Sequence, residues 1–184
     1  MNPFVITDEF LINCCQKLSD RLTRLTGVGG INYKIAYIAL TLYVAFDIFA
    51  HFIRGISLSG LIGVCFTVWI GIMYKRMYDR KENSEDGQTG VRAVDGFSRI
   101  WLWRFFRLLF LVFFGMNFWY LNMPPPADVT YDYNVYCLAL MAADLSFAVS
   151  LYFFACHKLP PCKGTAKEWL ASFGRKLVPA KNES

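Results

Sequence analysis

Few residues carry charge, and the short motifs of several common enzyme classes are missing. Charged residues make up 18% of the 184 positions, whereas an ordinary soluble domain has about a quarter. The chain has no GxxxxGK[ST] phosphate loop, no HExxH, no GxSxG and no CxxC pair. These absences argue against soluble-type ATPase, zinc-protease, serine-hydrolase and thioredoxin-like chemistry.

Histidine is scarce, and the cysteines do not have the pattern of a disulfide framework in a secreted protein. Of the two histidines, only His51 lies in an apolar run, so the paired histidines of a bis-haem cytochrome are missing. Two of the six cysteines, Cys65 and Cys137, lie inside apolar runs, where free cysteine behaves as a small hydrophobe. The N-terminus carries Asp8 and Glu9 and no basic stretch before an apolar core. We therefore expect no cleaved signal peptide and an uncleaved first span.

Apolar residues make up 55% of the chain and are gathered into four long runs. Each run is about as long as the helix needed to cross a bilayer. The sequence predicts an all-α integral membrane protein with four transmembrane helices at about 35–53, 56–74, 102–121 and 135–156. Residues 1–34 are expected to form a cytoplasmic helix and linker, 75–101 a cytoplasmic loop, and 157–184 a basic cytoplasmic tail.

Two amphipathic helices are predicted outside the four spans. In residues 7–25, apolar side chains recur at spacings of three and four: Phe10, Leu11, Cys14, Leu18, Leu22 and Leu25. This helix is expected either at the membrane interface, apolar face down, or packed across the inner mouth of the bundle. In the tail, Thr165 and Glu168 form a capping-box pattern that opens a basic amphipathic helix. We expect the tail helix to lie on anionic headgroups.

Small residues form a continuous face on two of the predicted spans. The second span carries Gly60, Gly63, Thr67 and Gly71 at spacings of three or four, and the fourth carries Ala139, Ala143, Ser146 and Ser150. Such faces let a neighbouring membrane helix approach closely. We interpret both as packing surfaces.

The segment 75–99 is rich in charge of both signs and is the place where we expect a protein partner. Just after it, Arg104 and Arg107 stand at the head of the third span, beside Trp101 and Trp103. Arginines near a helix end can snorkel to the headgroups while tryptophans anchor the interface. We expect that role for both arginines.

Basic residues are concentrated in the N-terminal segment, the central loop and the tail, whereas only Arg54 lies on the opposite side. The positive-inside rule therefore predicts that both termini are cytoplasmic and that the protein is in the cell (inner) membrane. Because the basic residues follow this topology and form no separate patch, we expect a lipid bilayer and no nucleic acid as partner.

The polar residues of the first span are the main candidate site. Tyr43, Asp47, His51 and Arg54 follow at spacings of four, four and three, so they share one helix face. Asp144 in the fourth span is expected at a comparable depth, roughly 10–13 Å from the outer end. An acid within a membrane helix is costly and is a functional candidate by default.

Several roles fit this group. Carboxylates and an imidazole suit a divalent cation; the same groups could relay protons, or line an outward-facing cavity for a small ligand. The alternative is a structural clamp, with Asp47 held by His51 and Arg54, and Asp144 kept neutral or bonded to Tyr or Ser. A weaker metal candidate is the inner-side set Cys156, His157 and Cys162, since thiolate and imidazole are zinc ligands. Its spacing is not that of a zinc knuckle, so we predict no metal and no cofactor.

Together these patterns favour a small multi-pass membrane protein of structural or interaction type, an accessory factor or complex subunit, rather than an enzyme. Transport of a small solute, or ion or proton coupling, centred on Asp47, His51 and Asp144, is the alternative. A metal-dependent membrane enzyme using the same residues is the third hypothesis.

Overall fold

The computed structural model describes residues 3–55, 58–86, 101–126, 131–159 and 165, which form five helices and no strand. The helices are α1 (Pro3–Thr26), α2 (Ile31–Arg54), α3 (Leu58–Asp86), α5 (Trp101–Leu121) and α6 (Tyr133–Ala155). Four stretches are long and apolar enough to cross a membrane: Ile31–Arg54, Gly60–Asn83, Leu102–Leu121 and Tyr133–Ala155. The prediction of an all-α chain with four helices of spanning length is confirmed.

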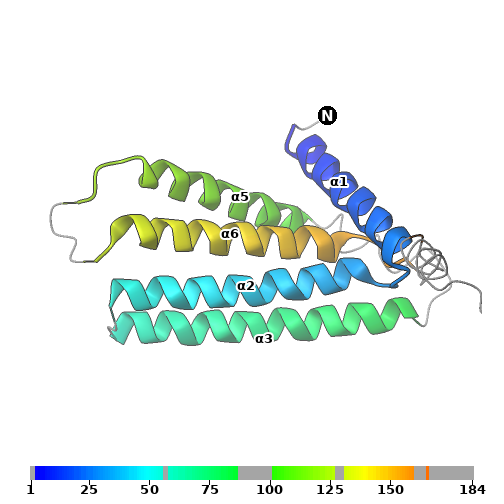
Figure 1. Ribbon diagram of the computed structural model, residues 1–184, viewed down its shortest axis with the longest axis horizontal. Helices are drawn as coiled ribbons and strands as arrows, with labels where there is room; N and C mark the ends of the chain where they lie inside the picture. The colour runs from blue at the N-terminus through cyan, green and yellow to red at the C-terminus, as the bar shows by residue number, and fades with distance from the viewer. Residues whose placement is uncertain (1–2, 56–57, 87–100, 127–130, 160–164, 166–184) are drawn as a thin grey trace, which may run out of the picture.

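The four long helices lie side by side in the order α5, α6, α2, α3, and α1 lies at an angle to them (Figure 1). Helix α6 is the most buried of the four, because it packs along both α2 and α5. Aromatic rings close the core between α3 and α6. The Tyr78 ring stacks on Phe154 at 4.2 Å between centroids, and Tyr74 meets Phe147 edge-on at 5.0 Å.

Helix α3 extends further than the sequence predicted. We expected a loop from residue 75, but the helix continues to Asp86. Tyr74, Tyr78 and Lys81 fall at spacings of four and three on one face of this extension, and all three are buried. The packed face holds the added turns in helical form. Residues 87–99 of the expected loop lie outside the described residues, as does most of the predicted tail helix.

Glycines make the connection from α1 to α2. The backbone N–H of Gly27 donates to the carbonyl of Thr23 at 2.8 Å, and Gly27 has φ 74°. Gly30, just before α2, has φ 66°. Left-handed backbone at both positions suits glycine, which lacks a Cβ. The chain thus reverses within a few residues, and α1 is brought back toward the end of the bundle.

The predicted amphipathic helix is present as α1, with its polar face toward the bundle. Asp8, Ser19 and Thr23 are buried, whereas Phe10 and Leu18 are 64% and 49% exposed. Gln16 adds a polar contact, since the backbone N–H of His157 donates to its side-chain oxygen at 2.7 Å. The apolar face predicted from residues 7–25 is therefore the outer face of this helix.

Candidate functional site

Asp47 of α2 is held by a residue of the neighbouring helix. The hydroxyl of Thr67 in α3 donates to Asp47 Oδ2 at 2.5 Å. His51, one turn further along α2, has Nε2 at 3.7 Å from the same oxygen. The side chains of Asp47 and His51 are 17% and 27% exposed, so the group is half-buried. It is a polar bridge between α2 and α3.

The small-residue face of α3 makes room for this bridge. A Cβ added at Gly63 would lie 2.7 Å from the His51 ring, and one at Gly71 would lie 2.8 Å from Val44 Cγ2. These glycines therefore face α2, and Thr67 lies between them on the same face. The interpretation of this face as a packing surface agrees with the geometry.

Asp144 of α6 is bonded to a different helix. Its Oδ2 accepts a hydrogen bond from the side-chain amide of Asn117 in α5 at 2.8 Å. Tyr43 lies one turn before Asp47 on α2 and contacts α6, the helix that carries Asp144. The Tyr43 ring packs on Phe147 with centroids 4.5 Å apart. The structure thus brings the two acids and Tyr43 near one another, while each acid keeps its own interhelical partner.

Arg54 does not join this group. It is exposed at the last position of α2 and lies beside Tyr136 of α6. The clamp that we predicted from His51 and Arg54 is therefore made by His51 and Thr67 instead. We also expected Asp144 to be bonded to a Tyr or a Ser, whereas its partner in the structure is Asn117.

The described residues contain no group of three or more His, Cys, Asp or Glu placed to hold a metal ion. Cys156 is fully buried, and its thiol donates to the carbonyl of Tyr152 at 3.3 Å. His157 is exposed, with its backbone bonded to Gln16. Cys162 lies outside the described residues. The thiol of Cys156 is therefore buried and hydrogen-bonded, whereas the His157 side chain is exposed.

A buried ion pair between α5 and α1 was missed from the sequence. Arg107 of α5 donates through Nε and Nη2 to the two carboxylate oxygens of Asp8 in α1, at 2.8 and 2.6 Å. Arg107 is 2% exposed and Asp8 is 0% exposed. Arg104 lies beside them, with Nη2 at 3.1 Å from Glu9. Our prediction that both arginines snorkel to headgroups is wrong for Arg107, because α1 supplies its partner inside the protein.

A second missed feature fixes the C-terminal end of α6. Lys81 of α3 donates to the carbonyl of Phe154, and its ammonium lies 4.6 Å from the centroid of the Phe154 ring. Asn32 of α2 donates to the carbonyl of Cys156 at 3.0 Å. Carbonyls at a helix C-terminus lack intrahelical donors, so these two side chains satisfy them. The sequence pattern places Lys81 in the expected loop 75–101 and gives no sign of this contact.

The polar groups of the helices therefore form interhelical links both within the bundle and at the end where α1 packs. No protein-family model, curated protein or solved structure matches this chain.

Proposed function

We propose that this protein is a four-span integral membrane protein that acts through structure and interaction, as an accessory factor or a subunit of a complex. The observation that carries the proposal is that each intramembrane acid is held by a neighbouring helix, Asp47 by Thr67 and Asp144 by Asn117. Carboxylates engaged in this way stabilise a bundle.

The outer surface supports placement in a bilayer. Large apolar side chains are exposed along the helices, including Phe52 at 68%, Leu58 at 78% and Trp119 at 64%. So many exposed apolar groups on a small protein suit a lipid environment. The exposed apolar face of α1, next to Lys17 and Arg21, suits an interfacial position at the same end.

Both termini are assigned to the cytoplasm, in a cell (inner) membrane. The N-terminal helix, the end of α3 and the start of α5 lie at one end of the bundle (Figure 1). Most basic residues of the chain belong to these parts and the tail, and this distribution follows the positive-inside rule. Protease protection of terminal tags in sealed, oriented vesicles tests the assignment.

The clamp is tested by a double-mutant cycle on Asp47 and Thr67, read as the Tm of purified protein in detergent. Asp47→Asn and Thr67→Val should each lower Tm, and the double variant should cost less than their sum. Interhelical hydrogen bonds of this kind contribute about 0.6–1.7 kcal/mol. Thr41→Val is the matched control, because Thr41 is exposed and its hydroxyl donates within α2 to Tyr37. Additive effects would overturn the clamp.

The interaction role predicts a stoichiometric partner that crosslinks to segment 75–99 in the native membrane. That association should survive Asp47→Asn. Loss of the partner in this variant while the protein remains folded would contradict the proposal.

Transport remains the second candidate, because the partial exposure of Asp47 and His51 leaves this pair accessible. It predicts that Asp47→Asn or Asp144→Asn abolishes flux in proteoliposomes while Tm stays above the assay temperature. The interaction proposal predicts no flux for the unmodified protein under the same conditions.

A further inference from the structure

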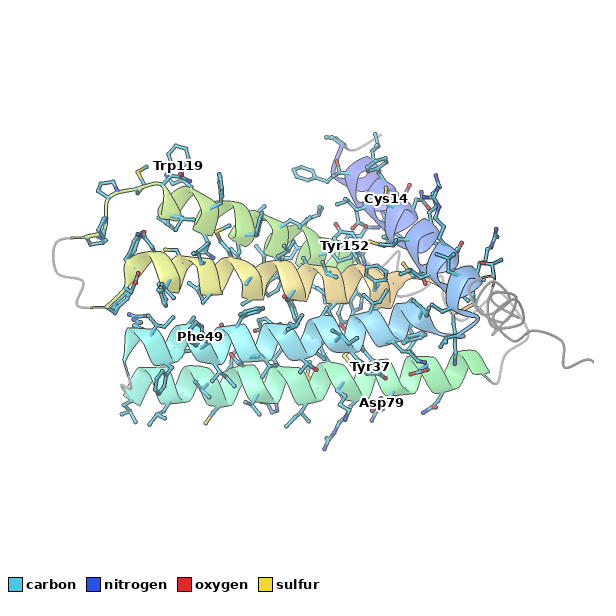
Figure 2. All side chains as sticks on the ribbon, viewed as in Figure 1. Cys14, Tyr37, Phe49, Asp79, Trp119 and Tyr152 are labelled. Atoms are coloured by element: carbon cyan, nitrogen blue, oxygen red, sulfur yellow. The ribbon has the colours of Figure 1, made fainter. Side chains whose placement is uncertain are left out.

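A groove runs between α2 and α3 on the outer surface of the bundle, with a volume of about 680 Å³. Its deeper part is apolar, with Leu40, Val44 and Val68 among the lining residues. Its other end is polar and contains Lys75, Asp79 and Glu82. Figure 2 shows Tyr37 and Asp79 near one another at this polar end, on the two helices that form the groove.

The length of the groove matches one leaflet of a bilayer. Val68 and Asp79 are eleven residues apart on α3, so this part of the groove extends roughly 16 Å along the helix. Half of a bilayer hydrocarbon core is about 15 Å thick. Asp79 lies about 32 Å from Leu58 along α3, counting 21 residues of helix, which places its carboxylate at headgroup level if the helix crosses the membrane.

The two carboxylates at the polar end of the groove, Asp79 and Glu82, have different partners. Tyr37 donates its hydroxyl to Asp79 Oδ1 at 2.6 Å, and Glu82 lies 3.8 Å from the Lys158 ammonium. Within the described part of the chain, no cationic side chain lies within ion-pair distance of Asp79. Asp79 therefore offers a negative charge beside the positive charge of Lys75.

We propose that this groove binds one phosphatidylethanolamine molecule from the adjoining leaflet, with an acyl chain along Leu40, Val44 and Val68, the ammonium on Asp79, and the phosphate beside Lys75. The inference rests on the membrane placement proposed above. A primary ammonium donates hydrogen bonds that a quaternary choline cannot donate. A serine headgroup adds a carboxylate, which Asp79 and Glu82 repel.

The test uses the purified full-length protein in detergent, titrated with phospholipids of identical acyl chains and followed by native mass spectrometry. Ethanolamine lipid should bind roughly three- to tenfold more tightly than choline, serine or glycerol lipid. Asp79→Asn should remove this preference, since the asparagine oxygen still accepts from Tyr37 while the charge is lost. Lys75→Gln should weaken binding of ethanolamine and choline lipids alike.

A second variant tests the acyl-chain position. Ala45 is exposed and lines the groove, so Ala45→Phe should block binding of every lipid tested. Leu42→Phe is the matched control for Ala45→Phe, and Glu9→Gln is the matched control for Asp79→Asn. Both control positions are exposed and lie outside the groove. Equal affinity for ethanolamine and choline lipids, or an unchanged preference in Asp79→Asn, would overturn the proposal.

Two further readouts separate this inference from the proposed membrane placement and from self-association. Carbonate extraction reports whether the protein is integral to the membrane. If the protein is integral but shows no lipid preference, only the assignment of the groove is wrong. If carbonate extracts the protein, the membrane placement and the lipid site are both wrong. If Ala45→Phe changes the oligomeric state and leaves lipid binding unaltered, a second copy occupies the groove and the proposal is wrong.

Discussion

Arg107 of α5 and Asp8 of α1 form a two-point ion pair that is almost completely buried. The pair joins the N-terminal helix to a helix that begins about a hundred residues later in the chain. Its two parallel hydrogen bonds fix both the distance and the orientation of the guanidinium. Because water does not reach either group, both depend on partners within the protein: Arg104 Nε also lies 3.7 Å from Asp8 Oδ2, and the Arg107 guanidinium lies 5.6 Å from the centroid of the Tyr152 ring.

Removing one member of this pair should release α1. We expect Asp8→Asn to destabilise the packed position of α1 by about 3–5 kcal/mol, since it removes the buried carboxylate that faces both Arg107 and Arg104. Limited proteolysis should then cut near the connection of α1 to α2, and Tm in detergent should fall.

The matched control is Glu9→Gln, because Glu9 is adjacent in sequence but its side chain is 49% exposed. It should leave proteolysis and Tm nearly unchanged. The double variant Asp8→Arg with Arg107→Asp should recover part of the lost stability. Equal protease resistance in Asp8→Asn and the unmodified protein would contradict the assigned role of the pair.

Gly71→Ala should weaken the packing of α3 on α2. The added methyl would lie 2.8 Å from Val44 Cγ2, and the β-branched valine has little rotamer freedom in a helix. We expect a loss of roughly 1–3 kcal/mol in the free energy of unfolding, as found for overpacked cores. Val44→Ala in the same chain should restore most of it, as measured by denaturation in mixed micelles.

Gly115→Ala provides the comparison for this prediction. Gly115 is also in an apolar helix, but an added Cβ would meet nothing within 4 Å. Alanine has the higher helix propensity, so this change should be neutral or stabilise by up to about 1 kcal/mol. A similar loss from both substitutions would show that close approach of α2 and α3 is not the cause.

Local patterns in the sequence predict local features of this fold. Run length and hydropathy predict four spanning helices, and spacing alone predicts that Gly63 and Gly71 share a packing face. Both properties depend only on residues near one another in the chain. The end of α3 was misplaced because residues 75–86 are polar by composition, and their buried face exists only where α6 packs on it.

The partners of the polar residues were harder to predict for the same reason. Spacing on α2 pointed from Asp47 to His51 and Arg54, whereas the hydroxyl that bonds it is Thr67 on another helix. Arg107 near a helix end suits snorkelling equally well if no other helix is present. Only the position of α1 decides between solvation by headgroups and pairing with Asp8.

Lys81→Met should destabilise the bundle where α3 meets the C-terminal end of α6. The lysine is buried, donates to the Phe154 carbonyl and lies over the Phe154 ring, so methionine would keep its bulk while losing the donor and the charge. We expect a cost of about 1–3 kcal/mol from the unsatisfied carbonyl, read as a lower Tm. Arg80→Met is the control, because Arg80 is the exposed neighbour and should change Tm little.

Cys15 on α1 should be alkylated slowly. Burial, and then the neighbouring Cys14, raise the pKa of Cys15 from 9.0 to about 11. Because the thiolate is the reactive form, labelling of Cys15 by iodoacetamide at pH 8 should be slow and should rise about tenfold per pH unit until pH approaches that pKa. Between pH 9 and 11 the unfolded chain ionises Cys15 more readily than the folded one, so stability should decline over this window.

The measurement uses Cys14→Ser and Cys15→Ser variants, which report on the two adjacent thiols separately by peptide mass spectrometry. Cys14 is exposed and serves as the internal comparison. Unfolding in denaturant should bring labelling of Cys15 up to the rate expected for an ordinary thiol. If Cys15 in the folded protein is labelled as quickly as Cys14 at pH 8, this face of α1 is not packed against the bundle. The Asp8–Arg107 ion pair would then not be buried either, because its burial depends on the same packing of α1.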